Sequence, residues 1–266
     1  MITLLLICLY GILLSAILGL KGLRNLSSPV GAPVGLPVGL PGDSPVAAGR
    51  GPTTRPEQIT IIGASGGTGK ALVSEGLRRG YRVTAFVRNP LRLRIEHPNL
   101  TIAKGDVLDP ASLDRALSGS GAVVSALGHH RYYSFARIHT RGTANILREM
   151  EKAGVARFVC ETSVGLGDTA GRGGLLYTLV VLPFVLPIYF LDKAGQEQVI
   201  AASNAEWTIV RPVGLTNKPA SGKIRHGAGM GSIVKSCWIS RADVAAFMLD
   251  QLENDEYIRR TPGVSA

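Results

Sequence analysis

The chain has 266 residues, of which 45% are hydrophobic and 18% charged, so it can bury a core and is not a disordered polypeptide. Its net charge of +10 suits an anionic partner, but no basic run with interleaved aromatic residues favours nucleic acid. We therefore expect an anionic cofactor or membrane surface. Cys8, Cys160 and Cys237 lie far apart and offer neither a zinc spacing nor a disulfide framework.

The N-terminal stretch 2–20 is apolar, uncharged and long enough to cross a bilayer as a helix. It is longer than a signal-peptide core and no basic side chain precedes it, so we favour a membrane anchor over the alternative, a cleaved signal peptide. Lys21 and Arg24 follow, and the positive-inside rule then predicts that the bulk of the chain faces the cytoplasm. The predicted division is an anchor or signal segment at 1–24, a disordered Pro/Gly-rich linker at 25–56 and a folded domain at 57–266.

A glycine-rich turn joins the first predicted strand, 58–63, to a predicted helix over 67–79. In such a turn the first glycine allows the bend, the second lets backbone approach a phosphate, and the third lets the helix pack on the sheet. Free amides at the helix N-terminus then bind the anion. The spacing is G-x-x-G-x-x-G, and an ordinary flexible loop is the alternative. We predict a dinucleotide pyrophosphate site made by Gly63, Ala64, Ser65, Gly66, Gly67, Thr68 and Gly69.

Strand and helix patterns alternate through the rest of the domain. Further strands are predicted at 82–87, 100–103, 122–126, 156–161 and 207–211. Further helices are predicted at 110–118, 134–153, 190–203 and 240–253. This alternation predicts an α/β fold with a doubly wound parallel sheet, the Rossmann fold, in a single soluble domain.

The residues after the next strands complete the predicted cofactor site. Arg88 stands where an NAD-specific site would carry an acidic residue, so we predict NADP (NADPH) over NAD; the alternative is a charge that only solvates the strand end. Asp106, beside Val107, either accepts from the adenine amino group or caps a turn. Small residues after the fourth strand would let backbone lie against the cofactor, and this stretch is Ala126, Leu127 and Gly128.

From about residue 57 to the end, the chain resembles the atypical short-chain dehydrogenase/reductase family, which includes biliverdin/flavin reductase-like and NmrA-like proteins. The matching pieces are GASGGTGK at 63–70, FVRNP at 86–90, GDVLD at 105–109, VVSALG at 123–128, GTANIL at 142–147, GVARFV at 154–159, WTIVRP at 207–212 and ISRADVAAFML at 239–249. Their order and spacing are typical of the family and indicate no particular substrate.

The resemblance implies a catalytic serine, tyrosine and lysine, which would be Ser163, Tyr189 and Lys193. Tyr189 and Lys193 are four residues apart and share a helix face, so the ammonium can lower the phenol pKa and hold the nicotinamide ribose. The phenol would then donate a proton to a carbonyl oxygen that Ser163 steadies. The alternatives are a chance spacing and a family member that lacks a working tyrosine, since Pro187 makes the local geometry uncertain.

Three other segments carry open interpretations. Pro212, after the sixth strand, is expected at the nicotinamide end of the cleft or in an ordinary strand exit. The uncharged stretch 174–191 is interrupted by two prolines, so we expect a lid over the substrate rather than a second span, with insertion into a membrane surface as the alternative. The glycine-rich loop 165–174 could close over the cofactor or simply be flexible. His129 and His130 suggest a solvated loop or a polar contact rather than a metal site.

The predicted function is an NADPH-dependent oxidoreductase that transfers a hydride to a small apolar carbonyl, quinone, flavin or tetrapyrrole-like substrate. The alternative is a non-catalytic NADP(H)-binding redox sensor or scaffold of the NmrA-like type, and an epimerase or dehydratase is a third possibility. The sensor needs the glycine turn and Arg88 but not Tyr189. No nucleic-acid partner is expected.

Overall fold

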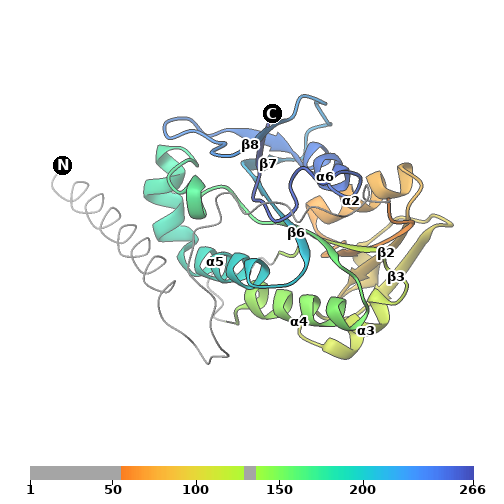
Figure 1. The fold of residues 1–266 in the computed structure, drawn as a ribbon. Coiled ribbons are helices and arrows are strands. Elements are labelled where there is room, and N and C mark those ends of the chain that lie inside the picture. Colours follow the sequence, from red (N-terminus) through yellow and green to blue (C-terminus); the bar gives the residue numbers. More distant parts are fainter. Residues whose placement is uncertain (1–54, 129–135) are drawn as a thin grey trace.

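The computed structural model describes residues 55–128 and 136–266, and at its centre lies an eight-stranded sheet with the order β3-β2-β1-β4-β5-β6-β10-β8 (Figure 1). Its strands are β1 (Gln58–Ile62), β2 (Arg82–Val87), β3 (Leu100–Lys104), β4 (Ala122–Ser125), β5 (Arg157–Glu161), β6 (Glu206–Pro212), β8 (Arg225–Gly227) and β10 (Gly263–Ser265). Neighbouring strands are parallel except β8, which runs antiparallel to β10. Two short strands, β7 (Gly214–Thr216) and β9 (Trp238–Ser240), form a separate parallel pair.

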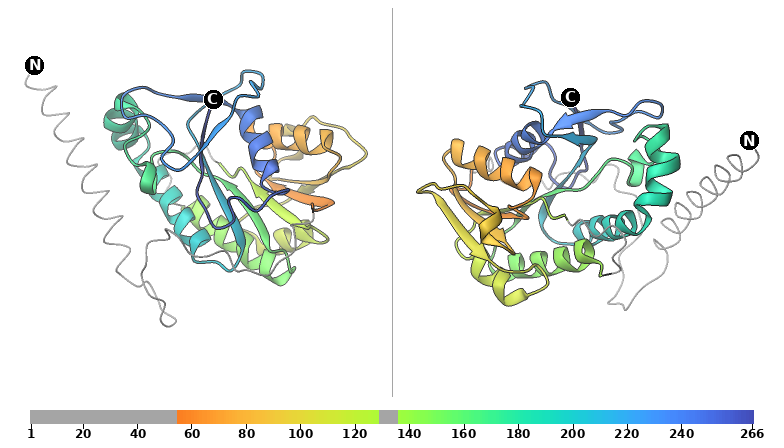
Figure 2. Two further views of the ribbon diagram at one scale, coloured as in Figure 1. Left: turned by 45° about the horizontal axis from the view of Figure 1, so that its top comes forward. Right: turned by 180° about the vertical axis from the view of Figure 1, so that it is seen from behind.

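Helices cover both faces of this sheet (Figures 1 and 2). On one face lie α2 (Gly67–Arg78) and α6 (Arg241–Asp250), and on the other lie α3 (Pro110–Leu117), α4 (Ile138–Lys152) and α5 (Pro187–Ala201). The connections add two 3₁₀ turns, η1 (Pro90–Arg92) and η2 (Gly167–Thr169), and a π-helix, η3 (Tyr177–Val185).

Two apolar cores result, because alternate side chains of each strand point to opposite faces. Ile59 and Ile61 of β1 pack with Leu72 of α2 in one core, whereas Ile62 packs with Leu113 of α3 in the other. All five side chains are fully buried. The parallel central strands therefore have both faces covered, as their nearly continuous apolar sequence predicts.

The α/β fold with a doubly wound, mostly parallel sheet is confirmed, and the six predicted strands and five predicted helices are all present. The predicted start of the third helix at 134 was wrong: α4 begins at Ile138, after Arg137 in the left-handed region (φ 49°). The fourth helix begins earlier than predicted, at Pro187, because proline is favourable in a first turn. Four strands of three residues each, β7 to β10, escaped prediction because so short a segment carries no period.

The predicted anchor and linker lie largely outside the described residues, so these divisions stay predictions. Within residues 55–128 and 136–266, no helix combines the length and the apolar character that crossing a bilayer requires. This part includes the stretch 174–191, where η3 ends at Val185 and α5 starts at Pro187.

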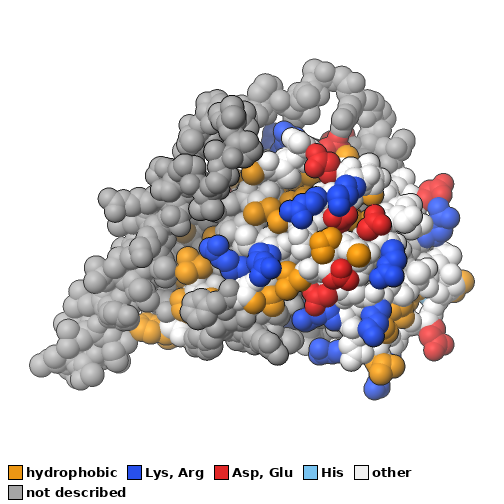
Figure 3. Space-filling model, turned by 90° about the horizontal axis from the view of Figure 1, so that it is seen from below, with side chains coloured by type: hydrophobic (Ala, Val, Ile, Leu, Met, Phe, Trp, Pro, Cys, Tyr) orange, Lys and Arg blue, Asp and Glu red, His pale blue; other side chains and the backbone are white. Residues whose placement is uncertain are grey.

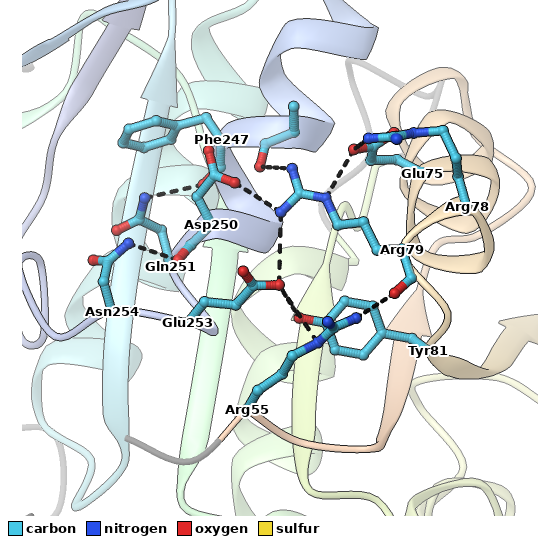
Figure 4. Close-up of polar contacts among 11 residues, drawn as sticks. Arg55, Glu75, Arg78, Arg79, Tyr81, Phe247, Asp250, Gln251, Glu253 and Asn254 are labelled. Atoms are coloured by element: carbon cyan, nitrogen blue, oxygen red, sulfur yellow. Dashed lines mark hydrogen bonds and ion pairs between the residues drawn. The ribbon is translucent and has the colours of Figure 1, made fainter. Parts of the chain in front are cut away.

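A network of charged and polar side chains lies at the amino-terminal edge of the sheet (Figure 4). Arg79 donates to Glu75 at 2.8 Å and to Asp250 at 2.7 Å, which ties the end of α2 to the end of α6. Tyr81 donates to Glu253 at 2.8 Å, and the Arg55 guanidinium lies 4.2 Å from the centre of the Tyr81 ring. The glycine turn lies at the opposite, carboxyl-terminal edge of the sheet.

Candidate functional site

The glycine turn lies at the carboxyl-terminal edge of the sheet, between β1 and α2. Gly63 has φ +76°, and a β-carbon there would come within 2.5 Å of the Ala126 carbonyl oxygen. A β-carbon on Gly69 would collide with the backbone of Gly63 and Ala64. Both positions therefore require glycine, one for the turn after the strand and one for the close packing of helix on turn.

The α2 N-terminus has the properties of an anion site. Gly66 caps the helix with extended backbone and is exposed, and a β-carbon there would meet only the Gly63 carbonyl, at 3.2 Å. The first-turn amides, which include those of Gly67 and Thr68, have no acceptor within the helix, and the first turn carries no acidic side chain. Backbone amides and a clear approach suit a pyrophosphate, so this turn fits the dinucleotide that the sequence predicts.

A chain of contacts connects this turn to the predicted catalytic lysine. The Thr68 hydroxyl donates to the Glu161 carboxylate at 3.0 Å, at the end of β5. The Lys193 ammonium on α5 donates to the Glu161 carbonyl oxygen at 3.2 Å and to the Leu127 carbonyl oxygen at 3.4 Å. Lys193 is 3% exposed, so these carbonyls hold a buried cation at the ends of β4 and β5. The structure thus brings Lys193 together with the predicted segment 126–128.

Glu161 is a buried carboxylate that sequence reasoning did not select. Burial raises the pKa of its carboxyl, against the lowering effects of Lys193, the Thr68 hydroxyl and Arg241. Arg241 was also missed. Its guanidinium lies over the turn, since a β-carbon on Gly67 would come within 2.5 Å of the Arg241 Nε, and its Nη1 donates to the Asn217 side chain at 2.7 Å. In the sequence Arg241 directly follows the strand-like segment Trp238-Ile239-Ser240, which was the available signal. No local pattern indicates that it lies beside Gly67.

The predicted adenosine end lies beside an open pocket of about 430 Å³ next to the end of β2. Its lining is Lys70, Leu91, Arg92, Arg94 and Ile95. Arg88 is exposed immediately after β2. Four cations on two adjacent segments, with no acidic residue among them, make this region suited to a phosphate.

Asp106 and Val107 lie after β3, and both make contacts within the protein. The Asp106 carboxylate accepts from the Leu108 amide at 2.9 Å, so it caps a turn, one of its two predicted roles. Val107 is buried, and its carbonyl oxygen accepts from the Asn145 side chain at 3.0 Å. Contact of either residue with the adenine stays a prediction.

Ser163 and two tyrosines occupy the other end of the site. The Ser163 hydroxyl donates to the Val164 carbonyl at 3.1 Å and lies close enough to the Tyr177 phenol to influence its pKa, which burial raises to about 12. The Tyr189 ring meets the buried His139 ring edge-on, with centroids 4.9 Å apart. Tyr177 was missed because no local spacing relates it to Ser163. The catalytic roles of Ser163, Tyr189 and Lys193 stay predictions.

Asp192 connects the start of α4 to α5. Its carboxylate accepts the backbone amides of His139 and Thr140 at 2.9 and 3.0 Å and also contacts the His139 Nδ1 at 2.9 Å. Burial opposes ionisation, but these hydrogen bonds outweigh it and hold the pKa of Asp192 well below its usual range. The carboxylate caps the α4 N-terminus from 53 residues away, and so fixes the His139 ring against which Tyr189 packs.

Arg211, at the end of β6, joins α5 to the glycine-rich loop. Its guanidinium donates to Glu197 at 3.0 and 2.7 Å and pairs with Asp168. The ion pair with Asp168 therefore connects the loop 165–174 to the end of β6. The sequence predicted a loop that either closes over the cofactor or is simply flexible. Pro212 is buried, and its carbonyl oxygen accepts the Val164 amide at 3.0 Å. Its contact with a cofactor stays a prediction.

His129 and His130 lie outside the described residues. Among residues 55–128 and 136–266, no group of three or more His, Cys, Asp or Glu side chains is placed to hold a metal ion. Cys160 is fully buried, and burial raises the pKa of its thiol to about 12, so it is unreactive as a nucleophile at neutral pH.

Comparison with known proteins gives a consistent result. A family model described as NAD(P)H-binding matches residues 63–255. An uncharacterised chloroplast protein of Arabidopsis thaliana is 30% identical over 176 residues, which are 63% of this chain and 62% of that relative, so the match spans less than two thirds of the relative's length.

Solved structures share the fold. A short-chain dehydrogenase/reductase from Veillonella parvula, solved in complex with NADP, has a TM-score of 0.67 and 21% identity over 79% of this chain and 95% of its own. An Escherichia coli O157:H7 protein described as an anaerobilin reductase has a TM-score of 0.63 and 22% identity over 78% of this chain and 96% of its own. At these identities the likeness concerns the fold alone.

Proposed function

The chain belongs to the NAD(P)H-binding family, among the atypical short-chain dehydrogenase/reductases, and from this membership we propose that it is an NADPH-dependent reductase of a small apolar carbonyl, quinone, flavin or tetrapyrrole-like compound. The observation that carries the proposal is the contact chain from the glycine turn through Thr68 and Glu161 to Lys193. It puts an anion-binding helix end and a buried ammonium at one edge of one sheet.

Each predicted residue has a task in this proposal. The α2 amides and Arg241 hold the pyrophosphate, Arg88 and the cations of the adjacent pocket hold the 2′-phosphate, and Lys193 holds the nicotinamide ribose. When bound, the dinucleotide supplies the hydride. Asp106 and Val107 lie along the adenine, the backbone of segment 126–128 lies against the cofactor, and Pro212 lies at the nicotinamide end.

The protein's own groups handle the substrate oxygen. The Tyr189 phenol donates a proton to it, and the Ser163 hydroxyl exchanges its hydrogen bond to the Val164 carbonyl for one to that oxygen, with Tyr177 beside the serine to orient it. An apolar substrate is supported by the surroundings, because Phe190, Leu182 and Tyr177 lie around Gly165, two residues after Ser163, at 3.4 to 3.8 Å from a β-carbon there.

A titration of the full chain with NADPH and with NADH tests the cofactor preference. Arg88→Ala is expected to weaken NADPH binding about tenfold, the effect of one lost charge-assisted hydrogen bond, and to leave NADH binding unchanged. The matched control is Arg82→Ala, at the other end of β2, where the side chain is 61% exposed and pairs with Glu57. Equal losses for both cofactors in Arg88→Ala would contradict the 2′-phosphate role.

Turnover of a substrate panel by Tyr189→Phe tests the chemistry. We expect a loss of at least about tenfold in kcat with unchanged NADPH affinity, and a smaller loss in Tyr177→Phe, whose phenol acts through Ser163. The non-catalytic sensor is the second candidate. If NADPH binds tightly to the wild type but no carbonyl, quinone, flavin or tetrapyrrole oxidises it, the sensor replaces the reductase.

A further inference from the structure

An exposed group of aliphatic side chains lies on η3, on the two residues before it and on the loop before β9, and we call it the apolar face. Its members are Leu175, Leu176, Val180, Val185, Ile233 and Val234. Leu176, Ile233 and Val234 are 68%, 64% and 66% exposed, which is unusual for adjacent large hydrophobic residues of a soluble protein.

Backbone hydrogen bonds hold the two segments of the apolar face together. The Gly174 amide donates to the Ser232 carbonyl at 2.8 Å, the Ser232 amide donates to the Arg172 carbonyl at 2.8 Å, and the Leu175 amide reaches the Val234 carbonyl at 3.5 Å. The exposed leucines of one segment and the exposed Ile233 and Val234 of the other are therefore neighbours on one surface.

The charge of these segments is of one sign. Between residues 171 and 191 and between 227 and 240, the formal charges are those of Arg172 and Lys235, both exposed, and neither segment contains an acidic residue. The face seen from below in Figure 3 differs, because acidic and basic side chains alternate there between the hydrophobic ones. An apolar surface with a cationic fringe is complementary to anionic lipid rather than to a second copy of itself, whose like charges would repel.

The inner side of the same helix packs against the site. Leu182 and Tyr177 of η3 lie 3.7 and 3.8 Å from a β-carbon at Gly165, and the Ser163 hydroxyl is within hydrogen-bonding reach of the Tyr177 phenol. The π-helix η3 thus has one side on the site and the other in solvent, so contact of its outer side with a bilayer would bring lipid within one helix diameter of the site.

We propose that the apolar face docks on the surface of an anionic bilayer, with its aliphatic side chains among the acyl chains and Arg172 and Lys235 at the headgroups. The sequence of the first 54 residues is compatible, since an uncharged apolar stretch at 2–20 precedes about 30 residues rich in Pro and Gly. Delivery of an apolar substrate from the lipid rests on the proposed function, whereas docking itself does not.

Site-specific fluorescence on the full chain tests docking separately from any anchor. With Cys8 and Cys237 replaced by serine, an environment-sensitive fluorophore is attached at Leu176→Cys and, in the control, at Ile102→Cys, which is 40% exposed in the edge strand β3. Vesicles contain phosphatidylcholine and phosphatidylserine at a ratio of 7:3, with or without acyl-chain nitroxide lipid. We expect at least twofold quenching at residue 176 and none at residue 102.

Two further variants test the chemistry of contact. The double variant Ile233→Asp, Val234→Asp should abolish the quenching at residue 176. The double variant Arg172→Gln, Lys235→Gln should reduce this quenching at least twofold in the phosphatidylserine vesicles. Protein that floats with the vesicles but shows no quenching at residue 176 would overturn the proposal, because the chain would then be tethered but not docked. Energy transfer between labels at 176 on two protomers, without lipid quenching, would also overturn it in favour of a second copy.

NADPH titration of each docking variant keeps the two proposals apart. Unchanged affinity shows that the variant is folded, so a lost quenching signal then reports docking. Absence of NADPH binding in the wild type, with quenching intact, would remove the proposed function and leave the docking surface in place.

Discussion

At the amino-terminal edge of the sheet, Arg79 donates to two carboxylates at 2.8 and 2.7 Å, whereas at the carboxyl-terminal edge Lys193 donates to two backbone carbonyls at 3.2 and 3.4 Å. The first cation is neutralised by short charge-assisted bonds (Figure 4). The second is buried with longer bonds to neutral acceptors, so its charge is not cancelled by them.

This difference separates a region of paired charges from the region of the proposed cofactor site on the same sheet. Charges that pair with each other contribute to the stability of the fold and leave little net charge to attract a ligand. A buried ammonium, free helix amides and a carboxylate of raised pKa have more to gain from a bound anion or ribose. The division predicts that variants at the two edges will affect different measurements.

Arg211 is the sharpest test of this division, because it lies at the carboxyl end of β6 yet pairs with two carboxylates. Arg211→Gln is expected to lower the free energy of unfolding by about 4 kcal/mol, since it leaves Glu197 as an unpaired, largely buried charge. Urea unfolding followed by circular dichroism measures it. Adding Glu197→Gln should restore part of the loss. Asp168→Asn, at a 54% exposed side chain, should cost below about 1 kcal/mol, and equal costs would contradict the anchoring role.

Asp192→Asn tests a long-range cap beside the site. The folded pKa of Asp192 is depressed, so its stabilisation is complete above its unfolded pKa of about 3.9 and is lost as the pH falls below that value and through the lower folded pKa. We expect a loss of about 3 kcal/mol in the free energy of unfolding at pH 7 that shrinks at pH 3. Asp114→Asn, at an exposed residue of α3, is the control. If the difference in the free energy of unfolding between the wild type and Asp192→Asn were the same at pH 7 and pH 3, the capping role of Asp192 would be contradicted.

Gly69→Ala tests whether the carboxyl edge binds through its backbone. The new β-carbon would push against the backbone of Gly63 and Ala64, so we expect a loss of about 2 kcal/mol in stability and of at least about tenfold in NADPH affinity. Gly76→Ala on the same helix meets only the side-chain methyl groups of Val83 and Ile59, at 3.3 and 3.5 Å, and should retain both properties. Comparable NADPH affinities in the two variants would refute the close-packing argument.

Arg79→Gln gives the smallest expected effect and the cleanest contrast. It should lower the free energy of unfolding by about 1.5 kcal/mol, because the half-buried network loses its central cation, and should leave NADPH affinity unchanged. Arg78→Gln removes another partner of Glu75, but this side chain is 71% exposed, so no measurable change is expected. A change of NADPH affinity in Arg79→Gln would break the division between the edges.

Local patterns predicted the elements whose signal is contained in a few consecutive residues. The apolar run of β1 and the amphipathic pattern of α2 are decided by burial of nearby side chains, and the glycines of the turn by backbone conformation. Short strands such as β10 (Gly263–Ser265) lack such a signal, since three residues become a strand only because β6 and β8 flank them.

The sequence by itself determined the alternating strands and helices, the glycine turn between β1 and α2 and the family, because periodicity and small-residue spacing are local properties. Only the tertiary structure decided where α4 begins, because its cap is Asp192 of α5. It also decided that Arg241 lies over Gly67, that Tyr177 reaches Ser163 and that two separate segments share the apolar face. These pairings join residues distant along the chain, and their geometry follows from the packing of the whole sheet and its helices.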